Sequence, residues 1–158
     1  MFSRNSLFVV AGVLGLLVGA RILFFPNSDQ QSHPLAKDME NPLPPCPNTP
    51  NCVRETKVFD AAKEKVFKTA LATLGHWNGW FHKANVQAQD AEKGGIVATF
   101  RIGVFTDDFL ILMAESNGKT YLHVRSASRV GHGDLGVNSR RVNAFFREIE
   151  QRLASTSP

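Results

Sequence analysis

The chain has 158 residues, of which 43% are hydrophobic and 20% are charged, and it contains 12 phenylalanines. This composition excludes an intrinsically disordered protein, which would carry more charge and fewer aromatic residues. The net charge of +4 is mildly basic and falls well short of that of a protein that coats nucleic acid. Two cysteines exclude a scaffold of several disulfides and any four-cysteine zinc or iron–sulfur site.

An apolar segment, residues 7–25, lies near the N-terminus. Arg4 precedes it, and Leu7–Ala20 contains no polar side chain before Arg21 interrupts the run. The segment is close to the ~20 residues needed to span a bilayer, and Arg21 can extend its side chain to the interface. The sequence therefore predicts that residues 1–25 are a membrane anchor or, alternatively, a cleaved signal peptide.

The position of Arg4 before the apolar segment favours export of the rest of the chain. We expect a membrane-anchored protein with an extracytoplasmic domain, which is periplasmic in a Gram-negative envelope, or a secreted protein if the signal is cleaved. Without Arg4 and Arg21 the exported part has 16 basic and 14 acidic residues. This balance is too even for strong binding to phosphate backbones, so we expect no nucleic-acid partner.

A proline-rich segment follows the apolar one. Seven of the eight prolines lie in residues 26–51, which predicts a stiff, polar tether. We expect one folded domain over residues 52–154 and a disordered tail over residues 155–158. Cys46 and Cys52 lie at the end of the tether, and in an oxidising compartment we expect a disulfide between them. A redox pair and two metal ligands are the alternatives.

Two segments have the apolar spacing of amphipathic helices. The first is predicted over Ala61–Leu74, with Asp60 as its N-cap, and the second over Ser139–Ala154, with Asn138 as its N-cap. The residues predicted to face inward are Ala62, Val66, Phe67, Ala70, Leu71 and Leu74 in the first helix, and Val142, Phe145, Phe146, Ile149 and Leu153 in the second.

The segments between these helices predict antiparallel strands. Alternation over Ile96–Phe105, with Val104 inward, is typical of a strand with one buried face. Asn117-Gly118 predicts a hairpin turn, and Asp107-Asp108 is interpreted as another turn. Further strands are predicted around Phe81–Gln89, Phe109–Glu115 and Thr120–Arg129, with an additional one over Thr56–Phe59 as an option. We therefore predict an α+β domain, in which both helices pack on one face of an antiparallel meander sheet of four to five strands.

The sheet face away from the helices, which we call the outer face, is the first candidate site. If Leu122 and Val124 face the helices, their strand presents alternate residues on the outer face. Arginine among them offers a planar fork of donors to phosphate or carboxylate. The alternative is a solvated face whose charges prevent aggregation. The outer-face residues are predicted to be Thr99, Arg101, Tyr121, His123, Arg125, Ala127 and Arg129.

The glycine-rich loop Val130–Val137 is the second candidate site. Its glycines permit unusual backbone conformations, and free N–H groups at the start of the following helix can bind an anion. The alternative is a structural clasp, in which Asp134 occupies those donors or pairs with Arg129. The glycine spacing matches a dinucleotide fingerprint, but no parallel strand follows the helix, so we expect no dinucleotide cofactor.

A catalytic role is a weaker hypothesis. Ser126 or Ser128 with His132 and Asp134 supplies the residue types of a serine hydrolase, but no nucleophile elbow surrounds either serine. His132 and Asp134 are too few ligands for a metal ion. We therefore expect neither a metal nor another cofactor.

Three stretches resemble the motifs of a known family. They are PCPNTPNCV at residues 45–53, FTDDF at 105–109 and RSASRVGHGDLGVNSRR at 125–141. On these motifs the chain resembles the domain-of-unknown-function 1499 family, over residues 45 to about 153. The resemblance implies a small exported or membrane-tethered domain and implies no activity. The positions that correspond to its last motif are Arg125, Ser126, Ser128, Arg129, Gly131, Asp134, Leu135, Gly136, Asn138 and Arg141.

These observations lead us to expect a non-enzymatic, membrane-tethered binding module for an anionic envelope ligand, namely a lipid headgroup, a glycan or an acidic patch of a protein partner. One alternative is an envelope enzyme that uses His132 and Asp134. Another is a structural partner in a membrane complex, for which Leu110 and Leu112 would make the outer face apolar. The resemblance leads us to expect a basic residue where His132 stands, so the charge there would depend on pH. The candidate ligand-binding residues are Arg125, Arg129, His132, Asp134, Asn138 and Arg141.

Overall fold

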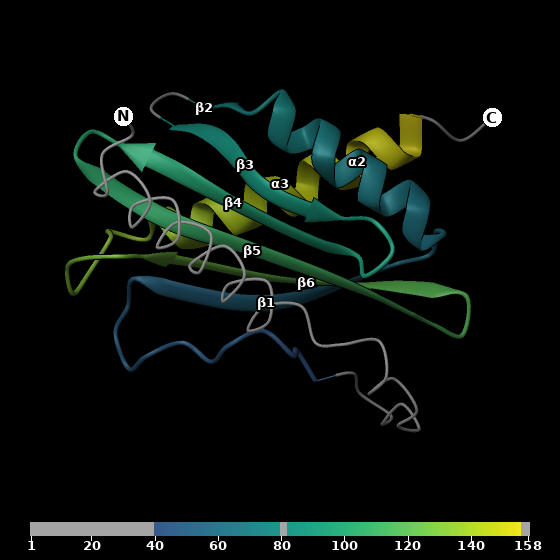
Figure 1. Ribbon diagram of the computed structural model, residues 1–158, viewed down its shortest axis with the longest axis horizontal. Coiled ribbons are helices and arrows are strands. Elements are labelled where there is room, and N and C mark those ends of the chain that lie inside the picture. Colours follow the sequence, from purple (N-terminus) through teal and green to yellow (C-terminus); the bar gives the residue numbers. More distant parts are fainter. Residues whose placement is uncertain (1–39, 80–81, 156–158) are drawn as a thin grey trace, which may run out of the picture. The chain divides into compact units, whose positions relative to one another are not determined.

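The computed structural model describes residues 40–79 and 82–155, and within them six antiparallel strands form one sheet that carries two helices (Figure 1). The predicted α+β class is confirmed. In chain order the elements are β1 (Cys52–Phe59), α2 (Lys63–Gly75), β2 (Asn78–Gly79), β3 (His82–Asp90), β4 (Gly95–Ile102), β5 (Phe105–Ser116), β6 (Lys119–Ser128) and α3 (Val137–Ser155).

The strand order in the sheet is β1-β6-β5-β4-β3-β2. Strands β3 to β6 form the predicted meander, and β1, the optional strand, lies at the edge beside β6. The two-residue strand β2 beside β3 was not predicted, so the sheet has one strand more than the four to five expected. The register places Cys52 opposite Ala127 and Phe59 opposite Thr120. The optional first strand is therefore present, and it begins at Cys52. Because the first and last strands are neighbours, the start of the domain lies next to the end of β6.

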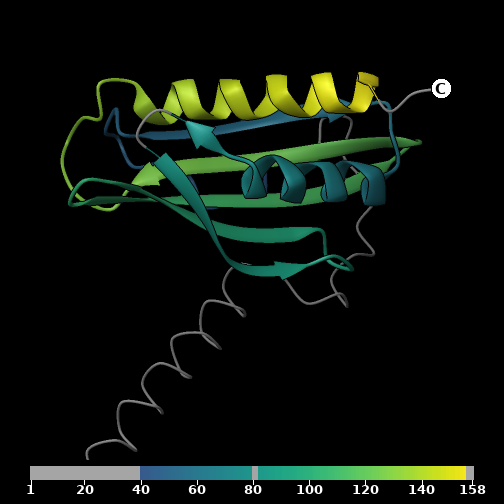
Figure 2. The ribbon, with the colours of Figure 1, turned by 90° about the horizontal axis from the view of Figure 1, so that it is seen from above.

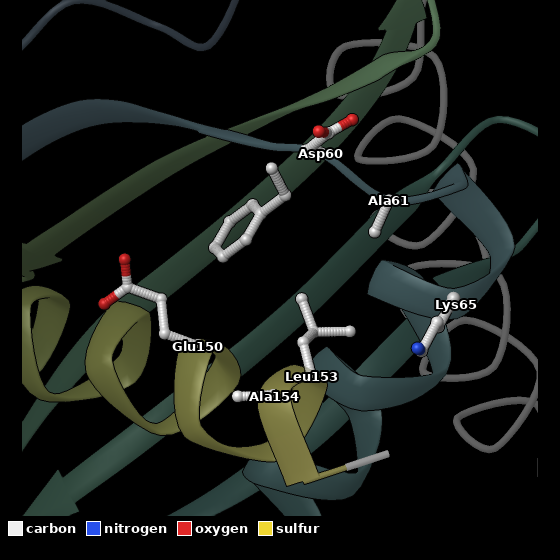
Figure 3. Close-up of a pocket in the computed structure, with 7 residues that line it drawn as sticks. Asp60, Ala61, Lys65, Glu150, Leu153 and Ala154 are labelled. Atoms are coloured by element: carbon white, nitrogen blue, oxygen red, sulfur yellow. The ribbon is translucent and has the colours of Figure 1, made fainter. Parts of the chain in front are cut away.

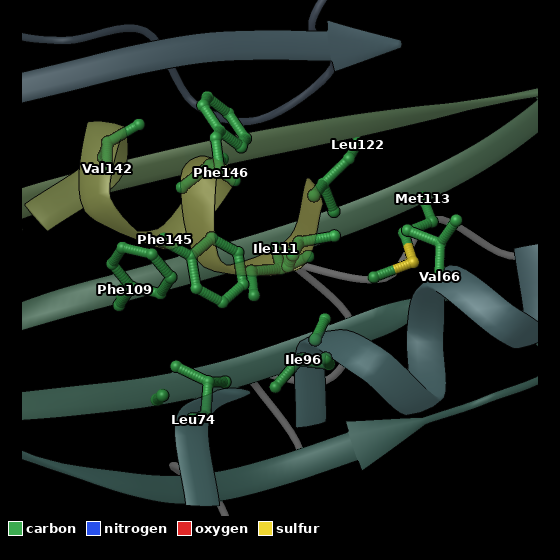
Figure 4. Close-up of a cluster of buried hydrophobic side chains, with 14 of the residues drawn as sticks. Val66, Leu74, Ile96, Phe109, Ile111, Met113, Leu122, Val142, Phe145 and Phe146 are labelled. Atoms are coloured by element: carbon green, nitrogen blue, oxygen red, sulfur yellow. The ribbon is translucent and has the colours of Figure 1, made fainter. Parts of the chain in front are cut away.

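Both helices contribute to one core together with β4, β5 and β6, as predicted (Figures 2 and 4). Aromatic side chains fill much of the space between the layers. The ring centroid of Phe109 lies 5.3 Å from that of Phe100 and 5.1 Å from that of Phe145, both in edge-to-face geometry. All the helix residues predicted to face inward are buried or packed against this core, with the exception of Ala62.

The start of α2 differs from the prediction. Ala62 occupies the N-cap position and makes no side-chain cap hydrogen bond, so the cap assigned to Asp60 was wrong. The backbone of Ala62 is extended, with a ψ of 142°, so the helix begins after it. Thr120 Oγ1 donates a hydrogen bond to the carbonyl oxygen of the preceding residue, Ala61, at 2.6 Å. That bond holds the chain beside β6 until Ala62, and it leaves Ala62 exposed.

The turn between β4 and β5 also differs. β4 ends at Ile102, which pairs with Phe105, and Gly103 between them has a φ of +58°. Glycine adopts this conformation at little cost, so Gly103 and Val104 form a tight two-residue turn. Val104 is exposed there and not inward. The predicted turn at Asp107-Asp108 was wrong, because both aspartates lie inside β5.

The turn between β5 and β6 forms as predicted, whereas the start of α3 differs from the prediction. Asn117 and Gly118 both have positive φ, which confirms the hairpin turn between β5 and β6. At the start of α3, by contrast, Asn138 is not the N-cap. The helix begins at Val137, and the Asp134 carboxylate takes the capping role by accepting the backbone N–H of Asn138.

Residues 40–51, the described part of the predicted tether, run alongside β1 (Figure 1). Asn41 Nδ2 donates to the carbonyl oxygen of Glu55 at 2.9 Å, and Leu43 is buried. Cys46 and Cys52 form the predicted disulfide. The predicted membrane segment lies outside the described residues, and none of the helices within them is long and apolar enough to cross a membrane.

The disulfide allows a first test. Replacement of both cysteines by serine (Cys46→Ser with Cys52→Ser) removes a constraint on the unfolded chain, and for so short a loop we expect the free energy of unfolding to fall by about 2 kcal/mol. Denaturant unfolding of the oxidised protein, the reduced protein and the variant measures this. The reduced protein should match the variant. Identical midpoints for all three would contradict a stabilising disulfide.

Candidate functional site

The first and last sequence motifs meet at the end of the sheet where β1 begins and β6 ends. Asn51 joins them: its Nδ2 donates to the carbonyl oxygen of Gly131 at 2.7 Å. Its own carbonyl oxygen accepts the backbone N–H of Ser128 and the Nδ2 group of Asn138, each at 3.0 Å. Residues from opposite ends of the domain are thus bound together by hydrogen bonds. We call this region the loop end.

A buried ion pair ties the middle motif to the last one. Arg141 Nη2 donates to Asp107 Oδ2 at 2.7 Å, and both side chains are only 2% exposed. Arg141 Nη1 donates to Ser126 Oγ at 3.0 Å and to Asn138 Oδ1 at 2.7 Å. Burial lowers the pKa of Arg141, and the hydrogen bond and charge of Asp107 oppose that effect. The pair fixes α3 against β5 and β6.

Asp134 is occupied by backbone donors. Its carboxylate oxygens accept the N–H of Gly136 at 2.9 Å and the N–H of Asn138 at 2.6 Å. Burial acts to raise the pKa of Asp134, but the hydrogen bonds from Asn138 and Gly136 outweigh it and lower the pKa. A carboxylate held in this way is a weak base. His132 is exposed, and no hydrogen bond joins it to Asp134 in the described part of the chain.

The contacts of Asp134, Asn138 and Arg141 therefore serve the fold, and ligand binding by these residues stays a prediction. Arg129 is also paired. Its Nε and Nη2 both donate to Asp108 Oδ1 on the outer face, at 3.0 and 2.8 Å. That hydrogen bonding, together with the charge of Asp108, raises the pKa of Arg129.

Arg125 differs from the other arginine candidates, because no hydrogen bond or ion pair reaches its guanidinium within the described residues. The side chain is half-buried on the outer face, and its Nε is fully buried. The register places Arg54 of β1 on one side of it and Leu110 of β5 on the other. Burial lowers the pKa of Arg125, Asp108 raises it, and Arg54 lowers it further.

Arg54 was missed by the sequence analysis. Its Nη2 donates to the carbonyl oxygen of Asn41, while its Nε is buried without a partner. Alternation along β1 puts Arg54, Thr56 and Val58 on one face. The residues alone do not tell which strand β1 joins, so the register with β6 is needed to place Arg54 opposite Arg125.

His123 lies on the outer face as predicted, but it is buried, with an exposed fraction of 1%. Its Nδ1 is 2.8 Å from Thr56 Oγ1 on the neighbouring strand. Burial and the charge of Arg54 lower the pKa of His123 to about 4. The imidazole is therefore neutral at physiological pH and adds no positive charge to the outer face.

The described surface has a hollow of about 320 Å³ that is lined by residues of α2 and α3, among them Thr73 and Arg147, and it has two others. One, of about 250 Å³, lies at the far end of β1 between the two helices, and none of the predicted site residues lines it (Figure 3). The other, of about 360 Å³, lies at the loop end, and Asp134 is the predicted site residue that lines it. Its walls also include Ile102, Phe105, Asp107, Ser128, Val130, Leu135 and Val137. Among the described residues, no group of three or more His, Cys, Asp or Glu side chains is arranged to hold a metal ion.

Comparison with known proteins identifies the family. A family model described as "Protein of unknown function (DUF1499)" matches residues 42–149, so the chain belongs to that family. No curated protein sequence matches the chain. The solved structure of Ara h 8.0201 is 12% identical, with a TM-score of 0.53, and the match covers 66% of this chain and 98% of that one. This likeness shows a shared fold alone. The structure of TTHA0849 from Thermus thermophilus is 16% identical, with a TM-score of 0.47 and coverage of 67% and 99%.

The buried ion pair predicts a large stability effect. Arg141→Met leaves the Asp107 carboxylate buried without its cation, and we expect a loss of about 3–5 kcal/mol in the free energy of unfolding. Arg147→Met, at an exposed position of the same helix, is the matched control and should change it by less than about 0.5 kcal/mol. Denaturant unfolding measures both. Equal effects of the two substitutions would show that the buried pair does not carry this stability.

His123 predicts a pH dependence of stability. Because its pKa is about 4 in the fold and 6.5 when unfolded, the unfolded chain binds the proton first. The stabilisation by neutral His123 is therefore complete above pH 6.5 and is lost as the pH falls towards 4, by about 3 kcal/mol in total. We expect His123→Gln to reduce the dependence of the free energy of unfolding on pH between pH 4 and 6.5, measured by denaturant unfolding. His132→Gln, at an exposed position, should keep the wild-type dependence. An unchanged slope in His123→Gln would refute the assignment.

Proposed function

We propose that this DUF1499 protein is a non-enzymatic, membrane-tethered extracytoplasmic module that binds an oxyanion, a phosphate or carboxylate group, on its outer face. Arg125 is its principal contact. The observation that carries the proposal is the half-buried guanidinium of Arg125, which lacks a hydrogen-bond acceptor among the described residues. The tethering part rests on the apolar character of residues 7–25.

The unpartnered state of Arg125 costs stability in the absence of a ligand. A buried donor without an acceptor costs about 1–3 kcal/mol, and like charges directly opposite across two strands add repulsion. Arg125 carries both costs, since its Nε is buried and Arg54 faces it. An oxyanion between the two guanidinium groups would supply the missing acceptors and cancel the repulsion. A bound anion therefore explains an arrangement that is unfavourable without one.

The surroundings of Arg125 suit recognition of a single anionic group. Arg54 offers a second guanidinium, and the Leu110 side chain on the other side lowers the local dielectric constant, which strengthens charge-assisted hydrogen bonds. The acidic residue nearest in the sheet, Asp108, is already bonded to Arg129. Among the described residues, the histidine on this face, His123, is buried and bonded to Thr56, so it is not available as a base beside Arg125. The geometry therefore favours binding over catalysis.

Substitution of Arg125 tests the proposal through two opposite effects. Arg125→Gln removes the repulsion with Arg54, so we expect the ligand-free protein to become more stable by about 0.2–1 kcal/mol. The same variant should lose the rise in melting temperature that inorganic phosphate gives the wild type, because binding stabilises only the state that binds. Thermal unfolding in a phosphate titration at constant ionic strength measures both effects.

The control is Arg101→Gln, which removes an exposed arginine from the outer face of β4. It should keep the phosphate-induced rise. A second arm with glycerophosphoglycerol, a phosphodiester that matches the headgroup of phosphatidylglycerol, distinguishes the two sources of the oxyanion. A headgroup site should be stabilised more by this diester than by inorganic phosphate, whereas a site for free phosphate should show the reverse order. The proposal is overturned if Arg125→Gln destabilises the ligand-free protein. It is also overturned if phosphate raises the melting temperature of this variant as much as that of the wild type.

A further inference from the structure

Exposed apolar side chains gather at the loop end. Among the described residues, the large hydrophobic side chains with the greatest exposure are those of Leu135 (93%), Val104 (86%), Val130 and Phe105. All four belong either to the turn between β4 and β5, with the first residue after it, or to the loop between β6 and α3. Figures 1 and 2 show these two loops at the same end of the domain. We call the four residues the apolar tip.

The apolar tip is one surface held on a firm support. Phe105, Val130 and Leu135 line the same hollow of about 360 Å³. The backbone N–H of Arg129 donates to the carbonyl oxygen of Thr106 at 3.1 Å, which ties the two loops together. Exposed apolar residues scattered singly need no explanation, but a contiguous patch marks an interaction site.

Leu135 shows that the exposure is built into the loop. Its φ is +53°, in the left-handed region that is unfavourable for a bulky residue. The neighbouring bonds enforce it: Arg140 Nη1 donates to the Leu135 carbonyl oxygen at 2.9 Å, and Asp134 accepts the N–H of Gly136 on the other side. Both the backbone conformation of Leu135 and the exposure of its side chain to solvent are unfavourable. A partner that covers the side chain would offset this cost.

The charge around the apolar tip is positive. Three acidic side chains lie in these loops and at the start of β5. Asp107 and Asp108 form ion pairs with Arg141 and Arg129, and Asp134 accepts hydrogen bonds from backbone N–H groups. The exposed basic side chains that remain are those of Arg101 and Arg140. Together, the four arginines Arg101, Arg129, Arg140 and Arg141 exceed the three aspartates Asp107, Asp108 and Asp134 by one positive charge.

From these observations we propose that the apolar tip inserts into the interface of an anionic lipid bilayer. This proposal rests on the tethering part of the proposed function, and it names a second contact between the domain and its membrane. A bilayer matches both features, because side chains at loop tips can enter its interfacial region while arginines meet the headgroups. A flat protein interface would instead need a broad apolar face.

The length of chain before the domain permits this contact. Fourteen residues separate the predicted membrane segment from the first described residue, Glu40, and in an extended polyproline form they reach about 43 Å. Asn41 is bonded to Glu55, three residues along β1 from Cys52 at the loop end. At about 3.3 Å per residue that distance is roughly 10 Å. The tether can therefore let the loop end touch the bilayer.

The test places a fluorophore on the apolar tip of the full-length chain. Val104→Cys offers a single reactive thiol, because the two native cysteines form a disulfide, and NBD attached there reports contact with lipid. We expect spin-labelled lipid to quench this fluorophore at least about twofold more strongly than one at Val86→Cys, an exposed apolar position on β3. The vesicles contain phosphatidylcholine with or without phosphatidylglycerol, and quenching should be stronger with phosphatidylglycerol.

Two further measurements make the outcomes distinct. Addition of Phe105→Ser and Leu135→Ser to the Val104→Cys chain should abolish the preferential quenching while its phosphate-induced stabilisation remains. Flotation of the same samples reports whether the chain is tethered. A chain that floats without preferential quenching overturns insertion of the apolar tip but leaves the tether intact. A chain that does not float overturns the tether and the insertion together. Equal quenching in both lipid mixtures overturns the preference for an anionic bilayer.

Discussion

The rest of the domain depends on the ion pair between Arg141 and Asp107. Removal of two charges from water is costly, and the cost is recovered only if the remaining donors and acceptors are also satisfied. This requirement accounts for the side chains around the pair, since Ser126 and Asn138 accept from the second nitrogen of the Arg141 guanidinium. Asn138 in turn binds the carbonyl oxygen of Asn51. One buried charge thus fixes the last helix, the last strand and the entry to the domain.

This dependence divides the motif residues into two groups. Asp107, Ser126, Asp134 and Asn138 make their hydrogen bonds inside the fold, as partners in the buried network or as the cap of α3. Arg125 stands in the same motif and has no such partner among the described residues. A motif rich in arginine and glycine is therefore not by itself a binding site. Only the residues that the buried network leaves over are available to a ligand.

The sequence predicted the parts of the structure that local pattern controls. Three local patterns were sufficient to predict the α+β fold class: the apolar spacing of both helices, the alternation along β6 and the hairpin turn at Asn117-Gly118. The turn at Asp107-Asp108 failed because each aspartate is stabilised in β5 by an arginine 34 or 21 residues away. Arg54 was missed for the same reason, since the pairing of β1 with β6 is a contact between the two ends of the domain. Local pattern cannot report either kind of partner.

The distribution of unfavourable features on the molecule is itself informative. The helix side of the sheet is well packed, and its buried charges, those of Arg141 and Asp107, form a hydrogen-bonded ion pair. Among the described residues, Thr73 Oγ1 of α2 is buried without a hydrogen bond on the helix side. Two further unfavourable features lie elsewhere: the facing guanidiniums of Arg54 and Arg125 on the outer face, and the exposed Leu135 with positive φ at the loop end. Strained or unsatisfied groups persist where a rigid surrounding structure holds them, and they concentrate at functional sites. The buried network supplies that rigidity here. The helix side therefore stabilises the domain, and the outer face and the loop end are where we propose contacts with an oxyanion and with a membrane.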